Sequence, residues 1–526
     1  MTDTVQQTQQ STSLLDFKPP ANKRPLLALI ALYSFESLGI RYVASSVREA
    51  GFEVIEIFFE DFKRNEFQYP KPNDLDSLIR LLRDKGVNVV GISLRSSYAK
   101  LAEIVTREIH ARLALPVIWG STHPTIMPDQ CIGICDALCR GEGEESIAEL
   151  MRRLRDGKDI SSIPGLWFRK ADGTVIKNEI GPYVDLDTIP DPDFGAPGKY
   201  YSKDGIWREG DPQKNEGAFI AISSRGCPHC CTFCTNTFFL QANPKYLRIR
   251  SVDRIIAEIR RAREVMPGIK RVKFYDDLFA TNKKWTDEFV VKYPREVGLP
   301  FDALLNPQHV TETLVDKLKQ AGMTLVEMGI QNGSERVSNE LYDRRLGNDK
   351  LRKAVRILHE SGLRVHYDLI IDNPLETSQD KRDCFEFMLD IPRPYSLFIL
   401  SLTHFPGTPL TERLLAEGKI TKDQVEGYTD KSLFQWEVSL THERPAEDKF
   451  WLALLSLLTK DFVPKSLIRW FSHQTFLMKH PSPLVAFAWL ANVLKMAGLA
   501  VTMYREGSLT WQMVRRHANI RRLAVK

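Results

Sequence analysis

Four cysteines lie within eight residues of this 526-residue chain, in the run Ser-Ser-Arg-Gly-Cys-Pro-His-Cys-Cys-Thr-Phe-Cys that begins at Ser223. Three of them, Cys227, Cys231 and Cys234, have the spacing C-x3-C-x2-C. This spacing fits three thiolate ligands on one face of an iron–sulfur cube better than a disulfide or a tetrahedral zinc site. Because such clusters usually take four cysteines, a group of three leaves one iron open for a ligand that is not protein.

Two other interpretations compete with the cluster. Zinc would have to use the pairs Cys227/Cys230 and Cys231/Cys234, but structural zinc sites usually place about a dozen or more residues between their ligand pairs. Two adjoining pairs cannot fold back around one ion. Plain buried thiols are the second alternative. Cys230 lies outside the spacing, and we interpret it as a small loop residue beside the cluster.

The full motif, C-x3-C-x-aromatic-C with Phe233 as the aromatic residue, resembles the signature of the radical S-adenosylmethionine (SAM) enzymes. The resemblance implies that Cys227, Cys231 and Cys234 hold a [4Fe–4S] cluster, and that SAM chelates the fourth iron.

Ahead of this motif, residues 24–154 alternate short apolar runs with amphipathic helical stretches. The alternation predicts a doubly wound, Rossmann- or flavodoxin-like parallel sheet, which binds ligands at the carboxyl ends of its strands. The turn at Gly120–Thr125 and the run Arg140–Glu144 lie at such ends. The predicted strands are Leu26–Leu32, Glu53–Phe58, Asn88–Ser93 and Leu115–Trp119.

A block of this kind directly before the cysteine motif resembles the cobalamin (B12)-binding domain of the B12-dependent radical SAM enzymes. The D-x-H-x-x-G box, whose histidine binds cobalt in many B12 proteins, is replaced here by Ser34-Phe-Glu-Ser-Leu-Gly39. The resemblance therefore implies cobalamin held without a histidine ligand. A flavodoxin-like scaffold without a cofactor is the alternative. The residues implied in cobalamin binding are Ser34, Glu36, Gly39, Ser93, Gly120, Ser121 and His123.

A second set of cysteines, Cys131, Cys135 and Cys139, repeats every four residues in this block. We interpret them as small buried side chains rather than as ligands of a second cluster.

From Ala218 to about Leu415 strands and helices alternate again, which predicts a partial (β/α)6 barrel with its chemistry at the carboxyl ends of the strands. The cysteine loop follows the first of these strands. The predicted strands are Phe219–Ser223, Arg271–Tyr275, Pro300–Leu304, Leu325–Ile330, Val365–Ile371 and Leu397–Leu402.

Polar side chains follow several of these strands. Asp276 and Asp277 resemble the acidic motif that receives the amino group of SAM. The run from Glu327 to Arg336 is similar to the family's G-I-E-S-G-S-E, with Gln331 in place of the usual glutamate, and this likeness implies SAM contacts from Gln331, Ser334 and Glu335.

Two histidines of the predicted barrel are candidates for substrate contact or proton transfer, because a neutral imidazole can do either near pH 7. Period-two alternation places His366 and Asp368 on one face of the fifth strand. His404 follows the sixth strand in Thr-His-Phe-Pro-Gly-Thr-Pro. A hydrogen-bonded core histidine is the alternative for each.

The remaining segments complete the predicted domain plan. Residues 1–22 are predicted to be a disordered tail, 23–155 the cobalamin-binding domain, 156–216 a linker, 217–420 the barrel, and 421–526 a helical region. The start of the chain has neither a basic region nor an apolar segment, so we expect no signal peptide and a cytoplasmic location.

The helical region carries ten Lys/Arg against one acid from Phe462 to the end, whereas the whole chain has a net charge of +5. These basic residues alternate with aromatic ones, which suggests peripheral contact with a membrane surface such as the inner membrane, or else a solvated helical cap. The apolar run Leu484–Met503 contains Lys495 and is predicted to be buried or interfacial rather than transmembrane. Nothing resembles a groove for nucleic acid.

The leading functional hypothesis is a cobalamin-dependent radical SAM C-methyltransferase with a small-molecule substrate, for which the apolar tail favours a lipid, isoprenoid or tetrapyrrole. The resemblance also implies an electron donor of flavodoxin or ferredoxin type. One alternative is a cyclase or oxidoreductase of the anaerobic Mg-protoporphyrin monomethyl ester cyclase type. Another is a non-catalytic cobalamin- or redox-sensing protein.

Overall fold

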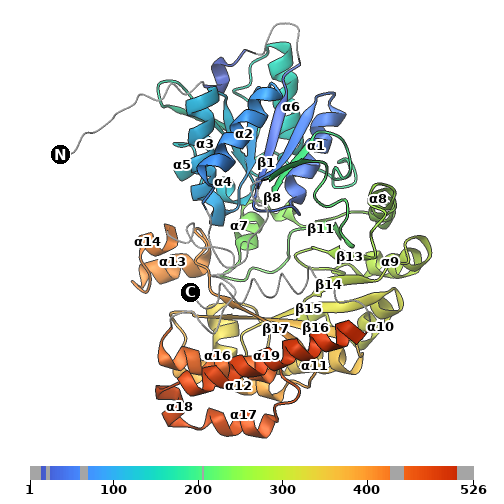
Figure 1. Cartoon of the computed structure of the whole chain (residues 1–526), viewed down its shortest axis with the longest axis vertical. Helices are drawn as coiled ribbons and strands as arrows, with labels where there is room; N and C mark the ends of the chain where they lie inside the picture. Colours follow the sequence, from blue (N-terminus) through green and yellow to red (C-terminus); the bar gives the residue numbers. More distant parts are fainter. Residues whose placement is uncertain (1–12, 19–23, 60–68, 204–205, 427–443, 506–526) are drawn as a thin grey trace, which may run out of the picture.

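A mixed β-sheet with a parallel centre, a parallel β-sheet and a group of C-terminal helices follow one another along the chain (Figure 1). The computed structural model describes residues 13–18, 24–59, 69–203, 206–426 and 444–505. The predicted tail falls largely outside these ranges. Leu14, however, lies within them and is fully buried in the first domain, because it is an apolar residue that packs with its neighbours. The prediction of a disordered tail is wrong at this point.

The first sheet has nine strands in the order β7-β6-β5-β4-β3-β1-β2-β8-β9. Its centre, β5 to β2, is parallel, and the order reverses between β3 and β1, where doubly wound sheets bind ligands. The strands are β1 (Leu27–Leu32), β2 (Val54–Phe59), β3 (Val89–Ser93), β4 (Val117–Gly120), β5 (Ala137–Cys139), β6 (Leu166–Arg169), β7 (Val175–Lys177), β8 (Lys199–Lys203) and β9 (Ile206–Glu209).

Helices cover both faces of this sheet. One apolar core lies under α2 (Pro72–Asp84) and α3 (Ala99–Leu113), and the other under α1 (Leu38–Glu49) and α6 (Glu144–Asp156). Strands β1 and β2 are buried along their whole length, as expected of continuous apolar runs in a parallel sheet.

The segment 156–216, predicted to be a linker, instead adds four strands to the edges of this sheet. β6 pairs antiparallel with β5, and β8 pairs parallel with β2. Strand-like runs at Gly165–Phe168 and Gly173–Lys177 are evident in the sequence and correspond to β6 and β7. β8 and β9 have only five and four residues, too few to show a period of two. The segment therefore belongs to the first domain as well as connecting it to the second.

The second sheet has six parallel strands in sequential order, as expected of a partial barrel. All six predicted strands are present, with bounds that differ by no more than two residues. They are β10 (Ala218–Ala221), β13 (Arg271–Phe274), β14 (Phe301–Leu305), β15 (Met323–Gln331), β16 (Arg364–Ile371) and β17 (Ser396–Ser401).

The outward faces of these strands form one large apolar core with the surrounding helices. These are α8 (Val252–Val265), α9 (Lys283–Glu296), α10 (Glu312–Gln320), α11 (Asn348–Glu360) and α12 (Ser378–Asp390). After β17 the chain continues through α13 (Pro409–Ala416) and α14 (Lys422–Glu426).

Four helices at the end of the described chain pack on the outside of the barrel (Figure 1). α16 (Ala446–Leu458) lies against α12, and the other three helices lie against α16. They are α17 (Lys465–Ser472), α18 (Thr475–Lys479) and α19 (Ser482–Arg505).

Candidate functional site

The cysteine loop connects β11 (Ser224–Arg225) to α7 (Thr235–Ala242) at the carboxyl end of the barrel. Thr232 anchors it, because its backbone N–H donates to the carbonyl of Tyr342 at 3.1 Å and its hydroxyl donates to the carbonyl of Leu341 at 2.5 Å. The ring of Phe233 meets the ring of Tyr342 edge-on, with 4.8 Å between centroids. The aromatic residue of the motif thus packs against Tyr342, which follows β15, and holds the loop on that side of the barrel.

The three motif cysteines are half-buried, whereas Cys230 is exposed. Burial raises the pKa of the Cys227 thiol to about 11 and that of the Cys234 thiol to about 12. Burial also raises the pKa of Cys231, and the nearby guanidinium of Arg344 partly offsets the rise. The thiols are therefore neutral without metal, and binding of iron must release their protons.

The spacing of the cysteines argues against a single metal ion. Within the described part of the chain, no three of their sulfur atoms lie within 4.8 Å of one another. A tetrahedral zinc site with Zn–S bonds of about 2.3 Å needs sulfur atoms about 3.8 Å apart. All eight cysteines are free, so disulfides do not explain the motif either. A polynuclear cluster, in which each thiolate binds a different iron, does not require three sulfur atoms this close together.

The two acids after β13 have different surroundings. Asp276 is buried, and it accepts hydrogen bonds from the Ser223 hydroxyl at 2.7 Å and from the Ser224 hydroxyl at 2.5 Å. Burial raises its pKa to about 6. Asp276 thus fixes the start of the cysteine loop, whereas Asp277 lines the cavity described below. Of the two, Asp277 is the one positioned to meet an ammonium group.

Gln331 ends β15 in a strained conformation, with φ of 65°. Its side chain folds back over Gly329, where an added Cβ would lie 2.2 Å from the amide nitrogen of Gln331. The buried Oε1 of Gln331 has no hydrogen-bond partner among the described residues. An orphaned acceptor held at this strand end fits a ligand that donates hydrogen bonds, as the ribose or ammonium of SAM would.

The structure places Ser334 and Glu335 in supporting positions instead. The Ser334 hydroxyl donates to Asp380 at 2.7 Å, and the carboxylate of Glu335 accepts from the backbone N–H of Asn348 at 2.6 Å. Both side chains belong to the turn that follows β15, and each already has a hydrogen-bond partner within the protein. We therefore retain only Gln331 of these three as a candidate SAM contact.

A polar cluster lies on the inner face of the barrel. Ligand atoms of Glu327, His366 and Asp368 all lie within 4.8 Å of one another. Burial, and then the charge of Glu327, raises the pKa of Asp368 to about 7, while burial lowers the pKa of His366. Near pH 7 this cluster can therefore donate and accept hydrogen bonds. His366 is in the lumen as predicted.

His404 is half-buried in the loop between β17 and α13. This loop is not part of the strands that carry Glu327, His366 and Asp368. Further along the same loop, a Cβ at Gly407 would contact Ile126 of α4 (Thr122–Ile126) and Phe238 of α7 at ordinary distances. The loop thus lies between the two domains beside the cysteine loop.

A cavity of about 390 Å³ opens at the carboxyl ends of the strands of the first sheet. Small residues form its floor. An added Cβ at Gly91 would collide with the Leu29 side chain at 2.8 Å, and an added Cβ at Gly143 would crowd the Val43 side chain at 3.2 Å. These glycines keep open a groove at the point where strand order reverses. Such a cradle fits the cobalamin predicted for this domain.

The cavity contains some of the predicted cobalamin residues and not others. Gly39, Ser93, Gly120 and Ser121 line it.

His123 instead packs in the core, where its Nδ1 lies 3.0 Å from the hydroxyl of Ser96 and burial lowers its pKa to about 4. Ser34 and Glu36 are not among the lining residues either, although Glu36 reaches the hydroxyl of Tyr275 at 3.5 Å. Cys131, Cys135 and Cys139 are buried as predicted.

The same cavity extends to the cysteine loop. Ser224, Arg225 and Gly226, directly before Cys227, line it together with Asp277. Tyr275 also lines it, and the carboxylates of Glu36 and Glu327 add to burial in raising the pKa of this phenol to about 12. The cobalamin groove and the start of the cysteine loop therefore share one cavity, and Tyr275 and Asp277 after β13 line its barrel side.

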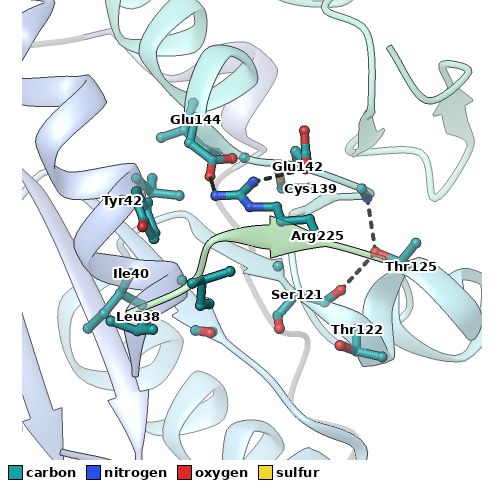
Figure 2. Close-up of a pocket in the computed structure, with 18 of the residues that line it drawn as sticks. Leu38, Ile40, Tyr42, Ser121, Thr122, Thr125, Cys139, Glu142, Glu144 and Arg225 are labelled. Carbon is teal, nitrogen blue, oxygen red and sulfur yellow. Dashed lines mark hydrogen bonds and ion pairs between the residues drawn. The ribbon is translucent and has the colours of Figure 1, made fainter. Parts of the chain in front are cut away.

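Arginines clamp the two domains at this cavity. Arg225 donates to Glu142 at 2.8 Å and to Glu144 at 2.6 Å (Figure 2). Arg248 also donates to Glu142, at 2.9 Å. Burial alone would lower the pKa of the Arg225 guanidinium, but the two carboxylates outweigh it and the pKa rises. In the sequence, the run Arg140–Glu144 is recognisable only as the end of a strand. Arg225, the partner that gives this run a role, is 83 residues from Glu142 and 81 from Glu144, so no local pattern reveals it.

Substitution of Gly120 by leucine is expected to lower cobalamin binding at least tenfold, equivalent to about 1.4 kcal/mol. A Cβ at Gly120 would lie 3.6 Å from the Cβ of Cys139, an ordinary contact, so the longer side chain extends into the groove without displacing the backbone. Bound cobalamin, measured by absorbance after gel filtration, checks this. Gly120→Ala should bind normally; full binding by a folded Gly120→Leu protein would contradict the assignment of the groove.

Comparison with known proteins agrees with this geometry. The model of the B12 binding domain matches residues 26–151, and the model of the radical SAM superfamily matches residues 221–388. Both predicted domains are therefore present, and the cofactors that they imply are a [4Fe–4S] cluster, SAM and cobalamin.

Two curated relatives and one solved structure extend this finding. The chain is 26% identical over 462 residues to an uncharacterized methyltransferase of Pyrococcus horikoshii, covering 84% of this chain and 91% of the relative. It is 27% identical over 383 residues to the cytidylyl-2-hydroxyethylphosphonate methyltransferase of Streptomyces wedmorensis, covering 64% and 69%.

The structure of the cobalamin-dependent S-adenosylmethionine radical enzyme OxsB, with aqua-cobalamin and S-adenosylmethionine bound, superposes with a TM-score of 0.63 at 15% identity. The match covers 95% of this chain and 83% of that one. At this identity it shows that the fold is shared.

Proposed function

We propose that this chain, a radical SAM enzyme with an N-terminal B12-binding domain, is a methyltransferase that acts on an unactivated carbon of a small molecule. The single observation that carries the proposal is the shared cavity. Residues from the cobalamin groove and residues directly before Cys227 line one space, so the sites of the two cofactors adjoin each other. Methyltransferases among the relatives support the same conclusion.

When bound, the cluster and SAM supply a radical that removes a hydrogen atom from carbon, and cobalamin supplies the methyl group. The chain's own residues position these groups. Cys227, Cys231 and Cys234 hold three irons, and Asp277 and the free oxygen of Gln331 bind and orient SAM.

The glycine floor of the first domain admits cobalamin beside this centre. The ion pairs of Arg225 with Glu142 and Glu144 hold that domain against the cysteine loop, which keeps the two cofactor sites in register.

The barrel lumen is the proposed substrate site. Glu327, His366 and Asp368 can bind a hydroxyl or amino group there, and Phe398, whose ring centroid lies 5.9 Å from that of His366, adds an apolar wall. A substrate with one polar group on an apolar body fits this lining. Lipid, isoprenoid and tetrapyrrole substrates share that character, and we propose this class.

The electron donor and the cellular location of the enzyme are also proposals. Reduction of the cluster requires an electron donor, for which we propose a flavodoxin or ferredoxin in the cytoplasm. The exposed Cys230 marks the side of the loop nearest to solvent, where such a donor would approach.

Counting the products made from SAM tests the function. After anaerobic reconstitution with iron, sulfide and cobalamin, and with a reductant present, we expect mass spectrometry to detect both 5′-deoxyadenosine and S-adenosylhomocysteine. The first reports radical formation and the second reports methylation. A cyclase would give 5′-deoxyadenosine without S-adenosylhomocysteine, and a non-catalytic sensor would give neither.

A further inference from the structure

The C-terminal helices expose an unusual share of the apolar side chains of the molecule. Among the described residues, fifteen large hydrophobic side chains are exposed, and ten of them lie between Phe462 and Tyr504. Isolated exposed hydrophobic residues are normal, but a concentration of this kind marks a surface that contacts something else. We call it the α17–α19 surface. It comprises Phe462, Trp470, Phe476, Trp489, Leu490, Leu494, Met496, Leu499, Val501 and Tyr504.

Packing within the chain leaves most of this surface uncovered by the described residues. α19 buries one narrow stripe, Leu484, Ala488 and Ala491, with the spacing of a single helix face. Only 17% of its apolar stretch Ser482–Val501 is buried. The helix lies along the outside of the barrel at the end of the molecule farthest from the first domain (Figure 1). Of the two predicted settings, buried or interfacial, the buried one is therefore wrong for most of α19.

Basic residues predominate on this surface, although Asp390 of α12 lies 3.8 Å from Arg469 and the exposed Asp461 precedes Phe462. Between Phe462 and Arg505 the sequence has five basic residues and no Asp or Glu. Arg469 keeps 57% of its side chain exposed, and Lys479 and Arg505 are exposed as well. Such a surface complements anionic lipid headgroups, which attract basic residues by about 1 kcal/mol each near the membrane.

The aromatic residues have the arrangement of an interfacial anchor. Trp470 contacts Phe471 with 5.3 Å between ring centroids, and Phe471 contacts Phe487 of α19 at 5.8 Å. α17 and α19 are thereby joined by aromatic rings, with Trp470 and Trp489 facing outward. Tryptophan is enriched at membrane–water interfaces because its ring is apolar and its N–H is polar.

A membrane-spanning role for α19 is less favourable. Lys495 lies within its apolar stretch, and a lysine at the centre of a bilayer costs about 2.5–3.5 kcal/mol on insertion scales. Its Nζ donates to the carbonyl of Thr459 at 2.8 Å, which holds the helix against the protein. These contacts favour a helix that lies in the interface.

We propose that the α17–α19 surface binds the face of an anionic lipid bilayer, with Trp470, Phe476 and Trp489 inserted among the headgroups. The basic side chains contact lipid phosphates, and the exposed half of α19 lies parallel to the membrane. The proposal rests on exposure, charge and aromatic contacts alone, and does not depend on methyl transfer. Such binding would place the enzyme beside an apolar substrate.

Vesicle sedimentation of the full chain tests this surface. We expect the protein to pellet with vesicles of phosphatidylcholine and phosphatidylglycerol, and at least tenfold less with pure phosphatidylcholine or in high salt. The triple variant Phe476→Ser, Trp489→Ser, Leu494→Ser should lose at least tenfold of this binding. These side chains are more than half exposed, so the variant should still fold, as circular dichroism would verify.

A matched control is Ile206→Ser, because Ile206 is 57% exposed but lies on β9 of the first domain. It should bind vesicles like the unmodified protein. Binding unchanged in the triple variant, or absent from anionic vesicles, would overturn the proposal. A dimer in solution that the triple variant abolishes would overturn it too, by assigning the surface to a second copy. Formation of 5′-deoxyadenosine, measured in parallel without vesicles, reports on the proposed function separately.

Discussion

Cys231→Ala should abolish formation of 5′-deoxyadenosine from SAM, to below the detection limit of mass spectrometry. Removal of one of three ligands leaves the cluster without a stable attachment, and without the cluster nothing reduces SAM. Cys231 is also central to the loop, since its carbonyl accepts hydrogen bonds from the Cys234 N–H at 3.0 Å and the Thr237 hydroxyl at 2.8 Å. Those bonds use the backbone, so the alanine variant should keep the loop and lose only the metal.

Cys230→Ala is the matched control for that experiment. Cys230 is adjacent in sequence but exposed, and it lies outside the C-x3-C-x2-C spacing. The variant should keep the iron content, the brown colour and the cleavage of SAM. Equal loss in both variants would indicate a general requirement for thiols and contradict the three-ligand assignment. Retained cleavage in Cys231→Ala would contradict it directly.

The barrel could be predicted from the sequence because each of its strands is an apolar run followed by an amphipathic helix. In Val365–Leu369, for example, the outward side chains are buried, whereas the inward His366 and Asp368 are half-buried. Local pattern is enough here, because sequential parallel strands pair with their nearest neighbours. The cysteine motif could be read for the same reason: its ligands are neighbours in sequence.

Long-range pairing explains what could not be predicted. β8 joins β2 across 140 residues, and nothing in the short run Lys199–Lys203 identifies its partner. Likewise the role of Arg225 depends on Glu142 and Glu144, which belong to another domain.

Resemblance to a motif also predicted SAM contacts for polar residues whose side chains instead hydrogen-bond within the protein. Asp276 and Ser334 match family positions, yet their hydrogen bonds are to Ser223, Ser224 and Asp380. His123 illustrates the alternative that was stated for the other histidines, a core imidazole with a hydroxyl partner. Sequence reveals the type of group at a strand end, but whether it faces the ligand depends on packing around it.

A buried ion pair within the first domain carries the largest expected effect on stability. Arg41 of α1 is fully buried and binds both oxygens of Asp211, with distances of 2.6 and 2.9 Å. Its guanidinium also lies over the rings of Phe58 and Phe194, at 4.6 and 4.4 Å from their centroids. Asp211 belongs to segment 156–216, for which the sequence predicts a linker. Its ion pair with Arg41 therefore holds that segment against the first domain.

Asp211→Ala should lower the free energy of unfolding by about 3–5 kcal/mol, because it leaves a buried guanidinium without its counter-charge. Urea denaturation of the full chain, followed by circular dichroism, measures the change. Arg107→Ala, which removes an exposed pair with Glu103, should change stability by no more than about 1 kcal/mol. The double variant Arg41→Met, Asp211→Leu should recover part of the loss, since it buries no charge.

The effect of Asp211→Ala should also depend on pH. Burial opposes ionisation of Asp211, but its hydrogen bonds from Arg41 and the charge of Arg41 outweigh burial and lower its pKa below the usual value. A carboxylate with a lowered pKa stabilises the fold above its unfolded pKa of about 3.9 and loses that contribution as the pH falls through its folded pKa. The difference in the free energy of unfolding between the original chain and Asp211→Ala should therefore be constant near pH 7 and shrink below about pH 4. A gap of less than about 1 kcal/mol at pH 7 would mean that water reaches the guanidinium and that the pair is not buried.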